Sequence, residues 1–149
     1  MKDSPASDIP VIGTFCTNPL VTLGKKFYFR ACFIDPFQGA GAATYAFRQL
    51  GFKRAATLTD VANDYSVGLS SFFKRAFEKL GGEIVAELKY QSGDQDFTAQ
   101  LTELISKKPD IVFLPAYFAE GAIILKVLTF TRWRTYLDAK YTFAQGEPC

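Results

Sequence analysis

Arg54-Ala-Ala-Thr-Leu-Thr-Asp-Val-Ala-Asn-Asp-Tyr-Ser-Val-Gly-Leu69 is a short apolar strand that leads directly into a helix, and Asp110-Ile-Val-Phe-Leu-Pro-Ala-Tyr-Phe-Ala-Glu120 repeats the pattern. A strand followed by a helix is half of a βαβ unit, which joins parallel strands. In open α/β sheets, ligands bind beyond the carboxyl ends of the strands. Tyr65 and Tyr117 fall at these ends. The two tyrosines are therefore candidate site residues, with ordinary packing as the alternative.

The rest of the chain continues this alternation of strands and helices. The strongest helical pattern runs from Leu69 to Leu80, where apolar residues recur with the spacing of one helix face. Further strands are expected at 9–12, 26–33, 83–90 and 111–114, and further helices at 36–50, after Asp96 and at about 119–128. Short links between alternating elements predict an α/β fold with a doubly wound, mostly parallel sheet and helices on both faces, as in Rossmann-like and flavodoxin-like domains.

The composition excludes several classes of protein. The formal net charge of +2 does not favour binding to nucleic acid or to an acidic membrane surface. The sequence has no histidine, which excludes Ser-His-Asp and Cys-His nucleophile systems and most catalytic zinc sites. The three cysteines, Cys16, Cys32 and Cys149, lack the spacing of a metal site. We therefore expect no catalytic residue, no metal and no cofactor, and so no enzyme.

Neither a signal peptide nor a membrane span is expected in this sequence. The N-terminal residues 1–8 are polar and lack the apolar core of a signal peptide. No run approaches the roughly 18 apolar residues that a membrane-spanning helix needs.

Two features that could indicate chemistry are better explained as structure. Gly39-Ala-Gly-Ala-Ala-Thr44 begins like a dinucleotide-binding fingerprint, but it ends in threonine and starts inside a predicted helix. Its small residues would instead let that helix approach the sheet closely. For Asp60 and Asp64, which follow a strand, we favour capping of the next helix over acid–base chemistry. The other acidic residues near strand ends are assigned to turns and helix starts: Asp94, Asp96 and Glu120.

The loop after the first strand carries a second group of candidate site residues, Thr14, Thr17 and Asn18. Hydroxyl and backbone N–H groups of a loop can bind a carboxylate without a cation. The alternative is a simple Thr-Asn-Pro turn. Together with the two tyrosines, this loop predicts a binding surface without catalytic groups.

Several stretches of the chain match one family in the same order: Ile9-Pro-Val-Ile-Gly-Thr-Phe-Cys-Thr-Asn-Pro19, Phe27-Tyr-Phe-Arg30, Asp35-Pro-Phe-Gln-Gly39, Asp64-Tyr-Ser-Val-Gly-Leu69, Gly81-Gly82, Asp96-Phe97 and Pro109-Asp110. In these residues the chain resembles the branched-chain amino acid (leucine/isoleucine/valine) binding proteins. These are the type I periplasmic solute-binding proteins of ABC importers. The resemblance covers residues from about 9 to 126.

The resemblance implies an architecture and a set of site residues. Such proteins have two α/β lobes that close on an amino acid through a hinge. By this comparison, residues 1–24 are a remnant of the first lobe and the approach to the hinge, 25–128 form a ligand-binding lobe, and 129–149 form a tail unlike the family. Thr17 and the backbone around Phe15 would receive the ligand carboxylate. The cleft would be lined from the second lobe by Tyr65, Tyr117 and Phe118.

The resemblance also implies a function and partners. The parent protein would be an extracytoplasmic receptor, periplasmic or lipid-anchored, that delivers a branched-chain or other aliphatic amino acid to an ABC permease. The family's carboxylate-binding serine and its ammonium-binding acid lie outside this sequence, so the chain alone should bind weakly or not at all. A lobe without its partner should also self-associate. The same lobe occurs in two alternatives, a flavodoxin-like enzyme or response domain and a ligand-sensing regulatory domain.

Overall fold

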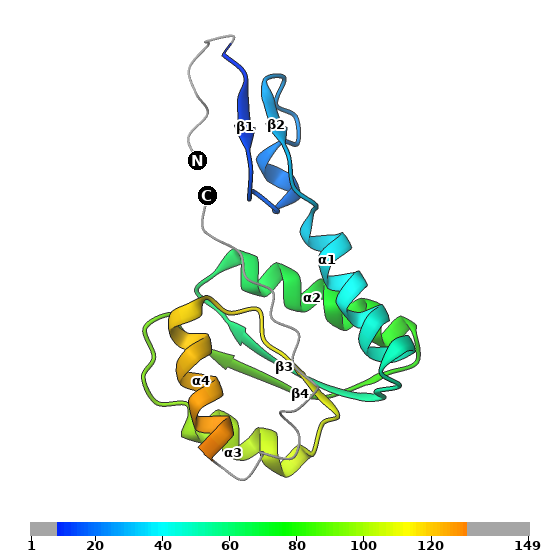
Figure 1. The fold of residues 1–149 in the computed structure, drawn as a ribbon, viewed down its shortest axis with the longest axis vertical. Coiled ribbons are helices and arrows are strands. Elements are labelled where there is room, and N and C mark those ends of the chain that lie inside the picture. The colour runs from blue at the N-terminus through cyan, green and yellow to red at the C-terminus, as the bar shows by residue number, and fades with distance from the viewer. Residues whose placement is uncertain (1–8, 131–149) are drawn as a thin grey trace.

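The computed structural model describes residues 9–130, which contain two parallel sheets. Strands β3 (Arg54–Asp60), β4 (Glu83–Tyr90) and β5 (Ile111–Phe113) form the larger sheet in the order β4-β3-β5. Strands β1 (Val11–Gly13) and β2 (Tyr28–Arg30) form a separate pair, also parallel. This pair projects from one end of the molecule, where α1 joins it to the rest (Figure 1).

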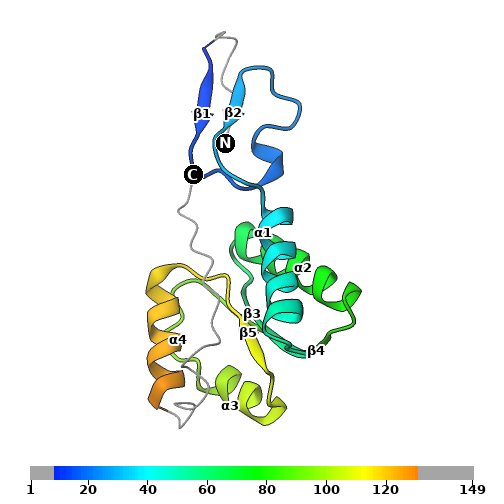
Figure 2. The ribbon, with the colours of Figure 1, turned by 45° about the vertical axis from the view of Figure 1, so that its right-hand side comes forward.

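The helices cover both faces of the larger sheet. Their bounds are Asp35–Thr44 for α1, Asp64–Lys79 for α2, Thr98–Lys107 for α3 and Phe118–Phe130 for α4. A short 3-10 turn, η1, spans Pro19–Val21, and a π-helical turn, η2, extends α1 over Tyr45–Gln49. Figure 2 shows α1 and α2 on one side of the sheet and α3 and α4 on the other. The predicted doubly wound α/β fold is confirmed.

Two apolar clusters, one on each face, explain why this sheet forms. Alternate residues of β3 enter different clusters: Ala55 packs with α1 and α2, whereas Ala56 and Leu58 pack with α3 and α4. In the first cluster the rings of Phe73 and Phe113 stack with their centroids 4.1 Å apart. A strand that is covered on both faces buries all its side chains, so a continuous apolar run stabilises it. β5 has this pattern.

The small residues of the 39–44 segment allow a close approach between helices, not the expected approach of a helix to the sheet. A Cβ added to Gly39 would lie 2.7 Å from the Cβ of Phe72 and 2.9 Å from the backbone nitrogen of Phe73. Gly39 therefore allows α1 to approach α2, not the sheet. The prediction of a close approach was right, but its partner was wrong, because α2 packs beside α1 at this point.

The predicted element bounds differ from the structure mainly at polar residues. Helix α2 begins at Asp64, five residues before the apolar pattern, because the side chain of Asn63 caps it by accepting from the N–H of Tyr65 at 3.0 Å.

The predicted tail at 129–149 lies almost entirely outside the described residues. No helix in the described part of the chain is long and apolar enough to cross a membrane.

Candidate functional site

The two tyrosines singled out by the sequence lie together. Tyr65 is in the first turn of α2, after β3, and Tyr117 directly precedes α4, after β5. Because β3 and β5 are neighbours in the sheet, these segments emerge side by side at its carboxyl edge. The two rings stack with their centroids 6.1 Å apart and an interplanar angle of 22°. Both residues remain partly exposed and form an aromatic wall.

The hydroxyl of Tyr65 is available for hydrogen bonding. The Nε2 of Gln38, in α1, donates to this oxygen at 3.4 Å. Burial raises the pKa of Tyr65, and the nearby Asp35 and Tyr117 raise it further, whereas Gln38 opposes the shift. The phenol is therefore neutral near pH 7 and can act as a hydrogen-bond donor.

The side chain of Arg30, in β2, makes several hydrogen bonds to the loop after β1. Its Nη1 donates to the backbone oxygens of Cys16 at 3.1 Å, Thr17 at 3.2 Å and Asn18 at 3.1 Å. Its Nη2 donates to the backbone oxygen of Pro19 at 3.0 Å and to the hydroxyl of Thr22. Residues 16–19 and 22 of the loop are therefore tied to the neighbouring strand.

Asp35 connects this loop to α1. Its backbone N–H donates to the oxygen of Thr17 at 3.1 Å. The residue is 2% exposed, and its Oδ1 has no hydrogen-bond partner among the described residues. Burial raises the pKa of Asp35, while hydrogen bonding to Thr17 and the charge of Arg30 partly offset this effect.

A cavity of about 560 Å³ lies between this loop and α1. It is lined by Thr14, Phe15, Thr17, Ala31, Cys32, Phe33 and Gln38. Its volume falls within the roughly 300–1,000 Å³ of small-molecule sites. The cavity brings together three of the predicted loop residues, Thr14, Phe15 and Thr17, but Asn18 does not line it. Cys32 is a free, partly buried thiol in its wall. Gln38 both lines the cavity and contacts Tyr65, so it links the loop to the tyrosine pair.

Phe118 is the predicted site residue that the structure leaves apart. It begins α4 directly after Tyr117, but it is 81% exposed, and unlike Tyr65 and Tyr117 its side chain makes no ring contact or hydrogen bond with another site residue in the described part of the chain. Sequence reasoning had in turn given no role to Arg30, Asp35 or Gln38. All three lie in stretches that carry the family resemblance, 27–30 and 35–39, but only the folded loop shows what Arg30 contacts.

The acidic residues at the strand ends hold loops together. The buried carboxylate of Asp60 accepts from the backbone N–H groups of Ala62 at 3.0 Å and Ser92 at 3.1 Å, and from the hydroxyl of Ser92. Asp60 thus ties the loop after β4 to the loop after β3, and the expectation that it caps a helix was wrong. Asp94 accepts a hydrogen bond within a turn and Asp96 accepts one at the start of α3, whereas Glu120, in the first turn of α4, accepts from the N–H of Gly93 in the loop after β4. The described residues contain no group of three or more side chains that could hold a metal ion.

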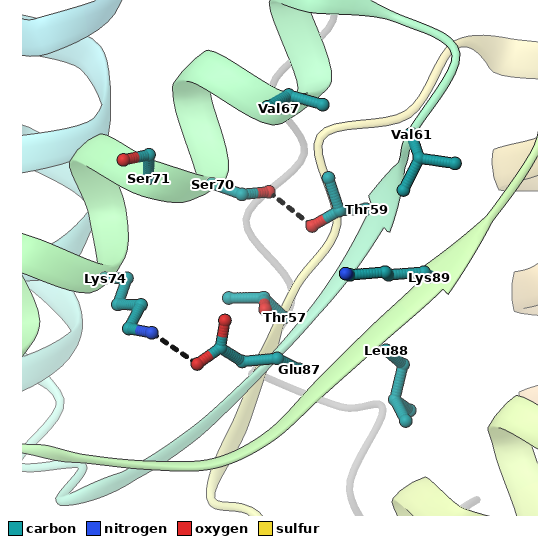
Figure 3. Close-up of a pocket in the computed structure, with 10 residues that line it drawn as sticks. All are labelled: Thr57, Thr59, Val61, Val67, Ser70, Ser71, Lys74, Glu87, Leu88 and Lys89. Atoms are coloured by element: carbon teal, nitrogen blue, oxygen red, sulfur yellow. Dashed lines mark hydrogen bonds and ion pairs between the residues drawn. The ribbon is translucent and has the colours of Figure 1, made fainter.

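A second cavity of about 440 Å³ lies between α2 and the edge strand β4 (Figure 3). Polar groups in its wall pair with one another: the hydroxyl oxygens of Thr59 and Ser70 are 2.7 Å apart, and Lys74 forms an ion pair with Glu87. None of the predicted site residues lines it. Because these four polar groups already have partners and none of the predicted site residues is present, the first cavity is the better candidate for ligand binding.

Comparisons with known proteins identify the family of this chain. The profile of the periplasmic binding protein family matches residues 4–129. The chain belongs to this family. Its members are solute-binding proteins and not enzymes, and the family acts outside the cytoplasm. The resemblance inferred from the sequence is therefore confirmed.

Several relatives and solved structures similar to this chain are named for binding amino acids. The chain is 34% identical over 116 residues to "Leu/Ile/Val-binding protein homolog 3" of Brucella melitensis, which covers 75% of this chain and 30% of the relative. The leucine binding protein LivK of Thermotoga maritima is 48% identical, with a TM-score of 0.77 over 83% of this chain and 36% of that one. LivJ of Streptococcus pneumoniae, in complex with isoleucine, is 31% identical, with a TM-score of 0.75 over 89% and 36%. The chain thus spans about a third of the length of these proteins.

Proposed function

We propose that this chain forms part of an extracytoplasmic receptor that captures a branched-chain or other aliphatic amino acid and delivers it to an ABC permease. The observation that carries the proposal is the cavity beside Phe15 and Thr17, which Gln38 links to the stacked tyrosines. Similarity to proteins named for binding leucine, isoleucine and valine supports the ligand class.

The proposed mechanism is capture by neutral groups. The hydroxyl of Thr17 and the backbone near Phe15 would bind the ligand carboxylate, and Tyr65 and Tyr117 would cover the side chain from the second lobe. Such hydrogen bonds strengthen when closure excludes water, because the effective dielectric constant falls. Closure of two lobes is a common way for a receptor to enclose a ligand. No bond is made or broken in this scheme, so we propose that the chain is not an enzyme.

We further propose how the chain divides between the two lobes. The N-terminal segment, 1–24 by the sequence, would belong to the first lobe and hinge, and the segment to 128 to the ligand-binding second lobe. Because β2 pairs with β1 in a sheet of their own, we place β2 with the first lobe and start the second lobe at Asp35.

The tail at 129–149 is proposed to be foreign to the family. The family profile ends at residue 129, which supports this division. An alignment with an amino-acid-binding protein of Pseudomonas aeruginosa covers 95% of the chain at 26% identity and therefore argues against it. Sequencing the coding region decides between the two, because a tail that matches relatives in frame would refute the proposal.

A chimera tests the ligand directly. Residues 9–130 would replace the equivalent segment of the Thermotoga maritima leucine binding protein, with which this chain is 48% identical. We expect a folded chimera to bind leucine within about tenfold of the parent's affinity, a difference of about 1.4 kcal/mol. The 149-residue chain alone should show no micromolar binding of leucine, isoleucine or valine in a calorimetric titration. A folded chimera without leucine binding would refute the proposed function.

A further inference from the structure

The two halves of the candidate site come from different parts of the fold. Phe15 and Thr17 lie in the loop between β1 and β2, whereas Tyr65 and Tyr117 lie at the edge of the larger sheet. A ligand that contacts both halves requires them to be held at a fixed separation. The residues that connect them are therefore as important for binding as the residues that touch the ligand.

Arg30 fixes the first half. It donates to the carbonyl oxygens of four consecutive residues, from Cys16 to Pro19, at 3.0–3.2 Å. Three of these oxygens share the two hydrogens of Nη1, and Nη2 reaches the oxygen of Pro19 and the hydroxyl of Thr22. The rigid plane of the guanidinium holds these two donor nitrogens apart, whereas a lysine ammonium offers one compact centre. Four carbonyls that point at one side chain set the orientation of the peptide planes of the loop. The position of Thr17 is thereby determined from β2.

The first turn of α1 connects this loop to the second half. The oxygen of Thr17 accepts from both Arg30 and the N–H of Asp35, the first residue of α1. Gln38 lies three residues further on, on the same side of the helix, and donates to the hydroxyl of Tyr65. A continuous series of contacts therefore runs from Arg30 through Thr17, Asp35 and Gln38 to Tyr65.

We propose that Arg30 is a positioning residue for the ligand-binding loop and that the first turn of α1 transmits this position to Tyr65. Arg30 itself faces the backbone of the loop and acts on the ligand only through Thr17. This inference rests on the proposed function for what the loop binds. The contacts themselves can be tested without a ligand.

Hydrogen exchange in the 149-residue chain tests the first part of the proposal. Three amides report on the loop because they donate within it: Thr17 to the oxygen of Phe15, and Leu20 and Val21 to Asn18. We expect Arg30→Lys to raise their exchange rates about tenfold or more, while amides of β3 stay protected. Arg54→Lys is the matched control, since Arg54 lies at the start of β3 and contacts Glu83 and the oxygen of Lys107. Unchanged exchange of the loop amides in Arg30→Lys would overturn the proposal.

A milder variant covers the case in which Arg30→Lys unfolds the chain. Thr22→Val removes one acceptor of Arg30 and leaves the guanidinium in place. Faster exchange confined to the loop would support the proposal, and no change there would overturn it. If the amides of β3 also exchange faster in Arg30→Lys, the substitution has destabilised the whole chain. Thr22→Val then becomes the variant that tests the role of Arg30 in the loop.

The NMR signals of Tyr65 test the second part of the proposal, the transmission from the loop to Tyr65 through α1. If Arg30 only stabilised the loop, its substitution would not change the signals of Tyr65. With ring-labelled tyrosine, Arg30→Lys should shift the Tyr65 signals, whereas those of the distant Tyr45 should stay in place. Identical Tyr65 signals would overturn the transmission through α1. The ligand is tested separately, by adding leucine to the chimera described above. Absence of leucine-induced tyrosine shifts in a folded chimera would count against ligand capture, while the exchange data on the 149-residue chain would still decide the positioning role.

Discussion

Arg30 and Asp35 meet at one atom, because the carbonyl oxygen of Thr17 accepts from the guanidinium of Arg30 at 3.2 Å and from the backbone N–H of Asp35 at 3.1 Å. Arg30 belongs to the small β1–β2 sheet, and Asp35 begins the helix that packs against α2. Thr17 is thus placed where the two parts of the described chain join. In a two-lobed receptor, this junction is where binding and lobe movement would be coupled.

Removal of either stacked ring should weaken ligand binding. In the leucine-binding chimera, Tyr65→Ala and Tyr117→Ala should each reduce leucine affinity about tenfold or more, since truncation of a central aromatic contact costs roughly 2 kcal/mol or more. Calorimetric titration measures the loss. Tyr45→Ala is the control, because Tyr45 is exposed in η2 and does not line the cavity. Unchanged affinity in both variants would remove the tyrosine pair from the site.

Asp35 should make stability depend on pH in an unusual direction. Because burial raises the pKa of its carboxyl group in the folded chain, the charged form costs stability at neutral pH. This cost should disappear as the pH falls through the raised pKa toward the ordinary value of 3.8, where the unfolded chain also binds a proton. The hydrogen bond from Thr17 and the charge of Arg30 oppose this shift, but burial is the larger effect.

The measurement compares the chain with Asp35→Asn by urea unfolding between pH 7 and pH 4. The natural chain should gain stability relative to the variant as the pH falls. Comparison of the two proteins cancels the titration of the other carboxylates. A relative loss of stability on acidification would mean that the charge of Arg30 outweighs burial and that the pKa of Asp35 is lowered.

Two glycines of α1 should respond to alanine in opposite directions. Gly39→Ala should destabilise the chain by about 1–3 kcal/mol, because the new methyl group would collide with the backbone and Cβ of α2. Gly41 lies in the same helix, and a methyl group added there would meet nothing within 4 Å, so Gly41→Ala should stabilise by about 0.5–1 kcal/mol. Chemical denaturation measures both changes. Equal effects of the two substitutions would contradict the close contact between α1 and α2.

The larger sheet was predictable because its signals are local. The alternation of β4 and the apolar run of β5 each identify a strand, and the expected bounds 83–90 are those observed. Tyr65 and Tyr117 could also be placed at one edge, because parallel strands share the direction of their carboxyl ends. Their stacking follows from the adjacency of β3 and β5, which the sequence pattern alone does not specify.

The connecting residues of the site were not predictable, because their roles depend on contacts between distant segments. Arg30 alternates with apolar neighbours and has the sequence pattern of an ordinary surface residue of a strand. Its four carbonyl partners become visible only when the loop folds back over β2. Asp35 similarly has the pattern of a favourable helix start, and its burial, with an oxygen that no described residue contacts by a hydrogen bond, is a property of the tertiary structure.

The small sheet should drive self-association of the 149-residue chain. Ile12 and Phe29 are partners in the β1–β2 register, and both are more than half exposed, so they form an apolar strip on one face. We expect a dimer or larger species by light scattering, and we expect Ile12→Thr combined with Phe29→Thr to shift it toward monomer. Threonine keeps the β-branched shape that suits a strand. Val67→Thr is the control, since Val67 is an exposed apolar residue of α2, away from this sheet. A monomeric natural chain, or equal association of all three proteins, would show that this strip is not the contact surface.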